Sequence, residues 1–255
     1  MNWLVNGVET ATTSLLTVAV SGDTEVSLSA VLTIVDINPD DVPLVGIDGT
    51  YHERYILGYD DGTVRPDNNI TRAEAAAIFF RIADDPDKQT KRVSSFKDIS
   101  NNDWYYDAVA YLEDKGVVSG YGDDSFRPND KITRAEFAKM AIIFMRVDQE
   151  TISHSFNDVP SSHWAVAYIA TAAAKGWVVG FDDGSFRPDN NITRAEVVSI
   201  INNLLNRKIE SDDIPASAVQ FKDLPKSHWA YAAIVEASSD HDFERKSNGF
   251  ELWDK

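Results

Sequence analysis

Residues 58–74 read GYDDGTVRPDNNITRAE, and this stretch recurs twice with few changes. The second copy is GYGDDSFRPNDKITRAE at 120–136, and the third is GFDDGSFRPDNNITRAE at 180–196. A block that returns at nearly fixed spacing is typical of a repeat architecture. The chain is therefore organised around these three copies.

An amphipathic helix is predicted at the end of each copy. Apolar residues follow at spacings of three and four, which places them on one helical face. The three stripes are Ala75, Ile78, Phe79, Ile82 and Ala83; Phe137, Met140, Ala141, Phe144 and Met145; and Val197, Ile200, Ile201, Leu204 and Leu205. Three equivalent stripes need one common place to be buried, so we expect a three-helix core with pseudo-threefold symmetry.

A second segment also occurs three times, as FKDISNNDW at 96–104, FNDVPSSHW at 156–164 and FKDLPKSHW at 221–229. Each tryptophan is predicted to open a helix, with Asp103, Ser162 or Ser227 as its N-cap. The first ITRAE copy has no such segment before it, and the last such segment has no ITRAE copy after it. We therefore expect a closed ring of units, in which 221–242 completes the unit begun at 51–95 and the others span 96–155 and 156–220.

The rest of the chain differs in character. Residues 16–20 and 26–35 alternate apolar and polar side chains around a turn at 21–23, which predicts a β-hairpin or the tail of a truncated upstream β module within 1–35. Residues 36–50 are expected to be a linker, and 243–255 a C-terminal tail. The predicted fold is mainly α, with helix–loop–helix repeats at 51–242 in a closed pseudo-threefold spindle and a small N-terminal β segment.

Composition excludes several classes of function. The net charge is −17 and the chain has no dense basic cluster, which argues against nucleic acid and anionic membrane surfaces as partners. The absence of cysteine excludes disulfides and cysteine metal sites. The longest apolar stretch, at 15–20, is too short to cross a bilayer. No signal peptide is visible at the amino terminus, so an extracellular protein would have this chain as a piece of a longer polypeptide.

The ITRAE segment contains a capping box. The Thr71 hydroxyl should accept from the Glu74 backbone N–H, and the Glu74 carboxylate should accept from the Thr71 N–H. Each such cap contributes about 1 kcal/mol, and the same pairs recur as Thr133 with Glu136 and Thr193 with Glu196. In the second copy Asp124 replaces a turn glycine, which predicts a strained left-handed turn.

Capping does not explain the arginine of the same segment, at Arg72, Arg134 and Arg194. A cation in the first helical turn opposes the macrodipole, so each arginine should have an anionic partner. Two alternatives remain: an Asp or Glu of the fold, or an external carboxylate or phosphate. An external ligand predicts that Arg→Ala abolishes binding with little change in the thermal midpoint, whereas an internal pair predicts a loss of stability.

Other candidates also have two interpretations. The turn arginines Arg65, Arg127 and Arg187 are either solvated or secondary anion receptors, and Trp104, Trp164 and Trp229 either anchor the core or stack on a sugar. The five histidines, His52, His154, His163, His228 and His241, show no ligand spacing and are interpreted as structural. The acidic turns do not fit an EF-hand. Neither a catalytic motif nor a metal or cofactor motif is recognisable, so we expect no enzyme activity.

The two repeated segments together resemble the S-layer homology domain, over residues 51–242. The resemblance implies a secreted, non-catalytic module that attaches surface proteins to the bacterial cell wall. It implies non-covalent binding of a wall glycan, typically a secondary cell wall polymer with pyruvylated amino sugars. It also implies a three-pronged spindle around a central helical bundle, with ligand grooves between neighbouring prongs.

Carried onto this chain, the resemblance assigns anion recognition to Arg72, Arg134 and Arg194. It assigns close approach of the glycan to Gly58, Gly120 and Gly180, and a groove-lining or supporting role to Trp104, Trp164 and Trp229. Departures at Asp124 and 129–131 make the second groove the weakest in this reading. The upstream part of the polypeptide is an expected partner. Alternatives are the wall-targeting part of a larger secreted enzyme, binding to peptidoglycan itself, and self-association.

Overall fold

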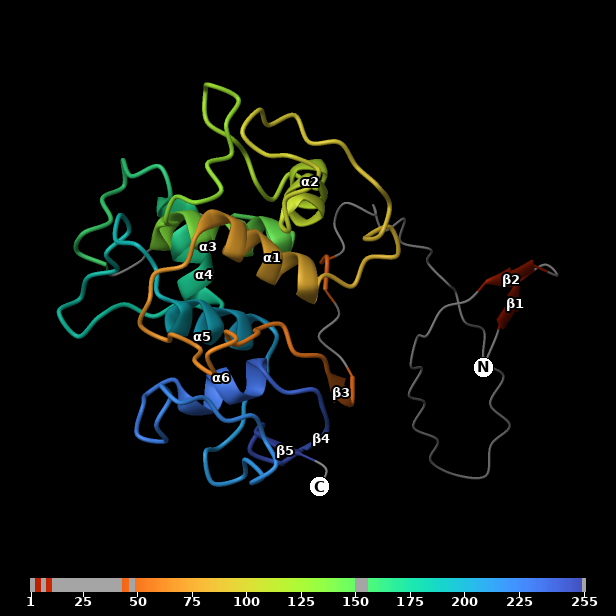
Figure 1. The fold of residues 1–255 in the computed structure, drawn as a ribbon, viewed down its shortest axis with the longest axis vertical. Helices are drawn as coiled ribbons and strands as arrows, with labels where there is room; N and C mark the ends of the chain where they lie inside the picture. Colours follow the sequence, from red (N-terminus) through yellow and green to blue (C-terminus); the bar gives the residue numbers. More distant parts are fainter. Residues whose placement is uncertain (1–2, 6–7, 11–42, 46–48, 150–155, 254–255) are drawn as a thin grey trace, which may run out of the picture. The chain divides into compact units, whose positions relative to one another are not determined.

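The computed structural model describes residues 3–5, 8–10, 43–45, 49–149 and 156–253 (Figure 1). They belong to two compact units, Met1–Asp36 and Ile37–Lys255. In the first unit, strands β1 (Trp3–Val5) and β2 (Val8–Thr10) pair antiparallel, with Trp3 opposite Thr10. The strands predicted at 16–20 and 26–35 lie outside the described residues.

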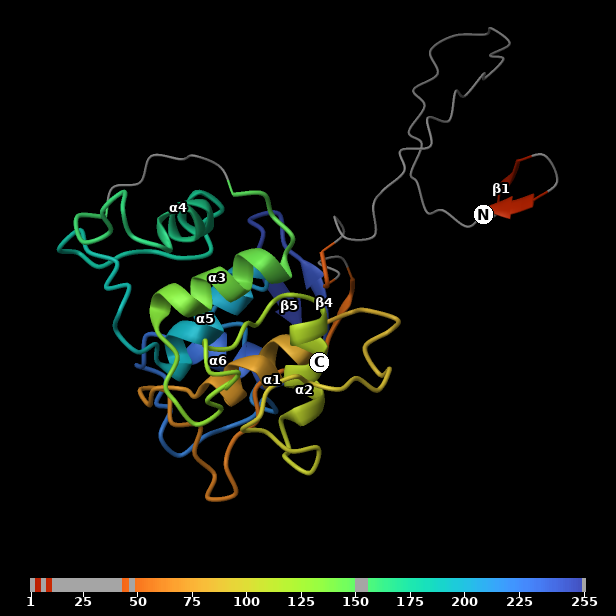
Figure 2. The same ribbon diagram turned by 90° about the horizontal axis from the view of Figure 1, so that it is seen from above.

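The second unit contains six described helices in two sets. The ITRAE copies form α1 (Arg72–Ile82), α3 (Arg134–Phe144) and α5 (Arg194–Leu204), and the tryptophan segments lead into α2 (Tyr106–Asp114), α4 (Val166–Ala174) and α6 (Tyr231–Ala237). In Figure 2 the first set lies side by side at the centre, and α2, α4 and α6 pack against α1, α3 and α5 respectively. The mainly helical fold predicted from the sequence is confirmed.

The predicted stripes form the core. Every one of their residues is buried, and they belong to a single hydrophobic cluster. Across helices, the ring of Phe79 lies 5.2 Å from that of Phe137 and 5.0 Å from that of Phe144, measured between centroids. Aromatic rings at this separation add to the stabilisation from burial. The three helices thus share one core, as expected.

The three capping boxes are also confirmed. The Thr71 hydroxyl accepts from the Glu74 N–H at 3.1 Å, and the Glu74 carboxylate accepts from the Thr71 N–H at 2.7 Å. The same reciprocal bonds occur at the starts of α3 and α5. Threonine and glutamate therefore fix where each central helix begins.

The predicted N-caps of the outer helices are wrong. These helices begin two residues after each tryptophan, and the residues before them, Tyr105, Ala165 and Ala230, make no side-chain capping bond. Residues 100–103 instead form a separate turn, because the Asp103 N–H donates to the Ser100 carbonyl. The Asp103 carboxylate is used in that turn, where it accepts from the Ser100 N–H at 2.8 Å.

Backbone hydrogen bonds join the three copies in a cycle. The Arg72 N–H donates to the Asp130 carbonyl at 2.9 Å. The corresponding bonds run from Arg134 to Asn190 and from Arg194 to Asn68, also at 2.9 Å. Each central helix thus begins on the turn of the next copy, and the third returns to the first. The three-pronged spindle itself stays a prediction.

The aspartate of each F-x-D segment holds the turn of an ITRAE copy. The Asp98 carboxylate accepts from the backbone N–H groups of Phe126 and Arg127, each at 2.7 Å. Asp158 binds the third copy in the same way, and Asp223 accepts from Val64 and Arg65 of the first. The last F-x-D segment therefore supports the first copy. The sequence alone does not predict this role of the aspartate.

These turns place non-glycine residues at positive φ. Asp124 has a φ of 62°, where Gly62 and Gly184 have 79° and 78°, so the predicted left-handed turn is present. Arg65, Arg127 and Arg187 also have positive φ, between 53° and 59°. Such backbone is unfavourable for L side chains, and the two hydrogen bonds to the F-x-D carboxylate offset that cost.

The glycine that opens each copy lies against the phenylalanine of an F-x-D segment. A Cβ on Gly120 would lie 2.3 Å from Cε1 of Phe96 and 2.7 Å from the Ser125 carbonyl oxygen. At Gly58 and Gly180 the phenylalanine carbon would lie at 2.5 Å. These glycines thus have a packing role, independent of any ligand.

Gly120→Ala should therefore lower the free energy of unfolding by about 1–3 kcal/mol, the usual cost of overpacking. Urea unfolding measures it. Gly122→Ala is the matched control, because a Cβ there would meet nothing within 4 Å. Equal stability of the two variants would contradict the close packing of Phe96.

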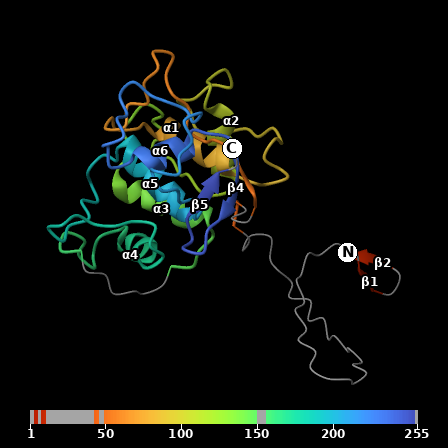
Figure 3. The ribbon, with the colours of Figure 1, turned by 90° about the horizontal axis from the view of Figure 1, so that it is seen from below.

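The beginning and end of the second unit meet in a small sheet. Strand β3 (Tyr51–His52) pairs antiparallel with β4 (His241–Arg245), which pairs antiparallel with β5 (Glu251–Trp253). Figure 3 shows β4 and β5 side by side. Phe243 and Trp253 are buried there, in the stretch expected to be a tail. Leu44 and Val45, within the stretch expected to be a linker, are buried as well.

Candidate functional site

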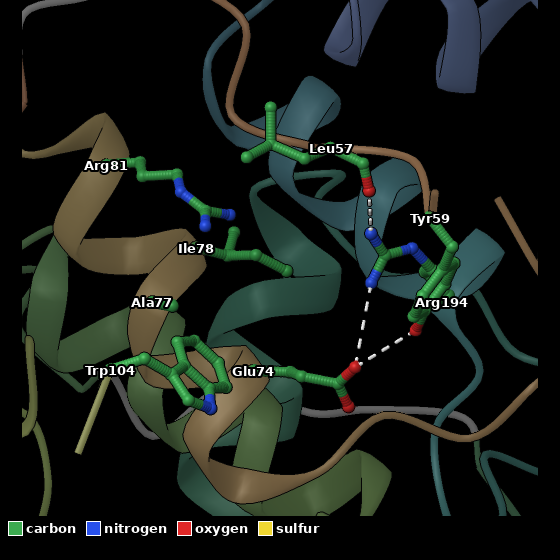
Figure 4. Close-up of a pocket in the computed structure, with 8 residues that line it drawn as sticks. All are labelled: Leu57, Tyr59, Glu74, Ala77, Ile78, Arg81, Trp104 and Arg194. Atoms are coloured by element: carbon green, nitrogen blue, oxygen red, sulfur yellow. Dashed lines mark hydrogen bonds and ion pairs between the residues drawn. The ribbon is translucent and has the colours of Figure 1, made fainter. Parts of the chain in front are cut away.

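The first groove lies beside α1 and collects residues from three parts of the chain (Figure 4). Trp104 comes from the tryptophan segment that follows, and Arg194 comes from the start of α5. Figure 4 shows Arg81 and Trp104 on one side of the groove and Tyr59 and Arg194 on the other. Its lining residues are Leu57, Tyr59, Glu74, Ala77, Ile78, Arg81, Trp104 and Arg194.

The second groove has the same construction, one copy further along. Trp164 comes from the next tryptophan segment, and Arg72 comes from the start of α1. Its lining residues are Arg72, Val117, Val118, Ser119, Gly120, Tyr121, Glu136, Lys139, Met140 and Trp164. An arginine and a tryptophan predicted from the motifs therefore meet in each groove. Of the predicted glycines, Gly120 lines the second groove, whereas Gly58 does not line the first.

In the third copy, Arg134 and Trp229 are equivalent to the arginine and the tryptophan that line each of the other two grooves. The Arg134 guanidinium donates to the Glu196 carboxylate at 2.7 Å and to the Val179 carbonyl at 3.4 Å. Ser199 and Asn203 stand where the second copy has Lys139 and the first has Arg81. The third copy therefore lacks the second cation that each of the other two carries.

The three tryptophans are exposed, which contradicts the alternative that they anchor the core. Trp104, Trp164 and Trp229 are 65%, 54% and 64% exposed. His163 and His228 stack on the neighbouring tryptophans, with ring centroids 5.7 and 5.8 Å apart. An exposed aromatic face at the rim of a polar groove is suited to stacking on a sugar ring.

The arginines of the ITRAE segment have partners inside the fold. Arg72 donates through Nε to the Phe126 carbonyl at 2.8 Å and through Nη1 to Glu136 at 3.3 Å. Arg134 makes the corresponding bonds to the Phe186 carbonyl and to Glu196. The acidic partner is thus the capping-box glutamate of the next copy, and the internal alternative is realised.

Arg194 is less completely bonded than the other two. It donates to the Leu57 carbonyl at 2.6 Å, but Glu74 lies 3.9 Å away. Its buried Nε has no hydrogen-bond partner within the described part of the chain. Burial, and then the nearby Arg194 charge, lowers the pKa of Arg81 in the same groove. An anion bound in the groove would offset this disfavoured Arg81 charge.

The turn arginines are also held by neighbours. Their guanidinium carbons lie 3.7–3.8 Å from the ring centroids of Tyr59, Tyr121 and Phe181. Each also pairs with the aspartate four residues earlier, at 3.0–3.1 Å. These pairs are largely exposed, where an ion pair contributes little to stability. Arg65, Arg127 and Arg187 therefore have local structural partners.

The aspartates of these turns should titrate unusually low. Hydrogen bonds from the Thr63, Ser125 and Ser185 side chains lower the pKa of Asp61, Asp123 and Asp183 to about 2. Because the folded pKa is depressed, their stabilising contribution is present above the ordinary pKa and disappears as the pH falls through about 2. Carboxyl NMR titration measures this. In Ser185→Ala the Asp183 pKa should return toward its ordinary value while Asp123 stays unchanged; equal movement of both would contradict the local cause.

Comparison with known proteins agrees with these motifs. Residues 50–76, 95–138 and 155–198 match the model of the S-layer homology domain. The three repeats are thus S-layer homology domains, and domains of this family are anchoring modules of the cell wall. Among the described residues, no helix has the length and apolar character needed to cross a membrane.

Several curated proteins share the repeats. A cellulosome-anchoring protein of Acetivibrio thermocellus is 36% identical over 220 residues, 84% of this chain and 48% of that protein. An S-layer protein of Bacillus licheniformis is 35% identical over 149 residues, 57% of this chain and 17% of that protein. An amylopullulanase of Thermoanaerobacterium thermosulfurigenes is 34% identical over 161 residues, 60% of this chain and 8% of that protein. The chain thus spans half or less of the length of each.

Proposed function

We propose that this chain is a non-catalytic cell-wall anchor that binds an anionic wall glycan in its grooves. The observation that carries the proposal is the pairing of cations with an exposed tryptophan in the first and second grooves. The first combines Arg81 and Arg194 with Trp104. The second combines Arg72 and Lys139 with Trp164.

These groups fit a sugar that carries a carboxylate. An indole face stacks on the apolar face of a pyranose ring, and guanidinium or ammonium groups bind the carboxylate by charge-assisted hydrogen bonds. A pyruvylated amino sugar of a secondary cell wall polymer has both features. Arg72 and Arg134 each bond a carboxylate of the fold, whereas Arg81 and Arg194 donate to the carbonyls of Tyr55 and Leu57. Arg81 and Arg194, with Lys139, are therefore the cations that a ligand carboxylate would neutralise.

The overall negative charge of the chain confines binding of an anionic glycan to the grooves. At −17 the chain repels an anionic polymer in general, so binding depends on the few cations concentrated in the grooves. Two or more weak grooves on one polymer would gain affinity through their high effective concentration. This arrangement suits a repetitive ligand.

We expect the third position to contribute least, whereas the sequence alone predicts that the second is the weakest. Asp124 is not among the residues that line the second groove. The third copy has Ser199 and Asn203 where the other copies have a second cation. A lone Arg134, already paired with Glu196 at 2.7 Å, is a weak anion receptor.

We also propose that each unit combines an F-x-D segment with the ITRAE copy that it supports. Phe221 and Asp223 contact Gly58, Val64 and Arg65, which supports the completion of 51–95 by 221–242. In this proposal 96–155 and 156–220 are the other units. The protein would be secreted and surface-located, with further domains in the same polypeptide.

Pull-down with purified sacculi tests the proposed ligand. The protein should bind intact sacculi and lose most of that binding after acid extraction of the secondary polymer. Undiminished binding to extracted sacculi would rule out the secondary polymer as the ligand and favour peptidoglycan itself. Binding to neither, together with concentration-dependent oligomers in sedimentation, would favour self-association.

A second candidate is the wall-targeting part of a larger secreted enzyme. The match to an amylopullulanase supports it, because the repeats there form a small part of an enzyme's length. Both candidates give the repeats the same task and differ in the rest of the polypeptide. The mass of the native protein and the sequence outside these residues distinguish them.

A further inference from the structure

Four ionisable side chains meet in the small sheet, away from both grooves. They are His52 on β3, Glu236 near the end of α6, His241 on β4 and Glu251 on β5. One ligand-type atom from each lies within 4.8 Å of the others. All four residues are buried, and both glutamates have no exposed surface. Buried charges of this kind need compensation.

Hydrogen bonds within the described part of the chain do not satisfy this cluster. Oε2 of Glu236, Oε2 of Glu251 and Nε2 of His241 are buried without a hydrogen-bond partner. Nε2 of His241 lies 3.1 Å from Oε2 of Glu236. Oε1 of Glu251 is paired with the Arg245 guanidinium at 3.5 Å, whereas its unbonded Oε2 faces His52 at 3.6 Å.

The His241 imidazole is oriented as in metal sites. Nδ1 of His241 lies 3.0 Å from the Ser239 carbonyl oxygen, so it carries the proton and leaves the Nε2 lone pair directed at the carboxylates. Metal-binding histidines commonly donate their second N–H to a backbone carbonyl in this way. Nδ1 of His52 lies 2.9 Å from Oε1 of Glu236 and 3.6 Å from Oε2 of Glu251.

We propose that these four side chains bind one divalent transition-metal ion, with Zn²⁺ as the best fit. Tetrahedral ligands at 2.0–2.1 Å from zinc lie about 3.3 Å from one another. Contacts of 2.9 and 3.1 Å join His52 and His241 to different oxygens of Glu236, and His52 lies 3.6 Å from Glu251. The ligand atoms lie within 4.8 Å of one another, so the side chains would close around the ion by about 1 Å on binding. Two carboxylates neutralise the ion, and two imidazoles select zinc over calcium or magnesium, which prefer oxygen ligands.

The surroundings indicate a structural site. Trp253 stacks on His241 and Phe243 lies over His52, with ring centroids 3.8 and 4.1 Å apart. Four protein ligands behind these rings leave no open position for a substrate. The ion would join β3, from the start of the second unit, to β4 and β5 at its end. The histidines, interpreted as structural from the sequence, show no motif because the ligands come from both ends.

Zinc titration of the untagged chain tests the proposal. Protein freed of metal by a chelator should bind one Zn²⁺ per chain in calorimetry. Zinc at about 100 times its dissociation constant should raise the thermal midpoint by roughly 5–10 °C. Co²⁺ should give the intense visible absorption of a four-coordinate ion. No binding, together with an unchanged thermal midpoint, would overturn the proposal.

Variants assign the binding to this cluster. Glu251→Gln and His241→Gln should weaken zinc binding by more than about 100-fold, since even outer partners of a metal site are worth about 10–100-fold. His228→Gln is the matched control, because that imidazole lies beside Trp229, and it should bind zinc like the parent chain. Equal zinc affinity in all variants would place the ion elsewhere and refute the assignment.

The metal-free variants separate a metal site from a plain ion-pair network. Glu251→Gln keeps the side-chain size and removes one buried charge, so it should fold and unfold at or above the midpoint of the metal-free parent. Zinc should then stabilise the parent and leave the variant unchanged. A variant that is less stable than the parent without zinc would show that the cluster needs no metal.

Discussion

Arg134→Ala should lower the free energy of unfolding by about 3–5 kcal/mol, the usual cost of removing one partner of a buried ion pair. The Arg134 side chain is 6% exposed and its Nη1 lies 2.7 Å from Glu196. Its loss leaves the Phe186 and Val179 carbonyls without this donor and Glu196 without its counter-charge. Urea unfolding measures the loss.

Arg187→Ala is the matched control, seven residues before the start of α5. Its pair with Asp183 joins side chains that are 42% and 57% exposed, so its removal should change stability by less than about 1 kcal/mol. If Arg134→Ala were equally mild and yet abolished wall binding, the internal pair would be incidental. The ligand role derived from the sequence would then be the correct one.

Trp104→Ala combined with Trp164→Ala should reduce binding to sacculi by at least about 100-fold. Each exposed indole should contribute about 1–3 kcal/mol of stacking, by analogy with aromatic stacking on nucleobases, and losing both grooves also removes the gain from joint binding. Stability should change little, because both side chains are more than half exposed. Binding isotherms with sacculi, and a thermal melt of the same sample, measure the two effects.

Trp229→Ala provides the comparison within the same chain. It removes an indole of similar exposure, 64%, from the copy that lacks a second cation. We expect a loss of less than about tenfold, since only one weak contact disappears. If the single Trp229→Ala change weakened binding as much as the double variant, the third position would be the principal site and our ranking would be wrong.

The elements that the sequence predicts well depend on local chemistry. The apolar stripes from Ala75, Phe137 and Val197 onward, and the capping boxes at their starts, involve residues a few positions apart. The burial of the stripes and the formation of the caps follow from helix geometry and side-chain hydrogen bonding alone. The left-handed turn at Asp124 is predicted for the same reason, since its cost belongs to one residue.

Features that depend on partners far away in the chain are harder to predict from the sequence. The glutamate that pairs with Arg72 is 64 positions away, and Glu236 is 184 positions from His52. No spacing along the chain indicates such pairs. The sequence alone therefore cannot decide whether the arginine has an internal or an external anionic partner, and it indicates no shared role for the histidines. The repetition of F-x-D three times was a usable signal, because an aspartate kept at one place in each unit suggests a common acceptor role.

The support of the first copy by Asp223 also sets a limit on when this chain can fold during its synthesis. Val64 and Tyr55 take partners at Asp223 and Ala237, which the ribosome adds long after them. Part of the surface of the first copy stays uncovered until residues 223–237 have emerged from the ribosome. Contacts this far apart in sequence make folding slow. The first copy thus stays incompletely folded while the second and third copies are synthesised.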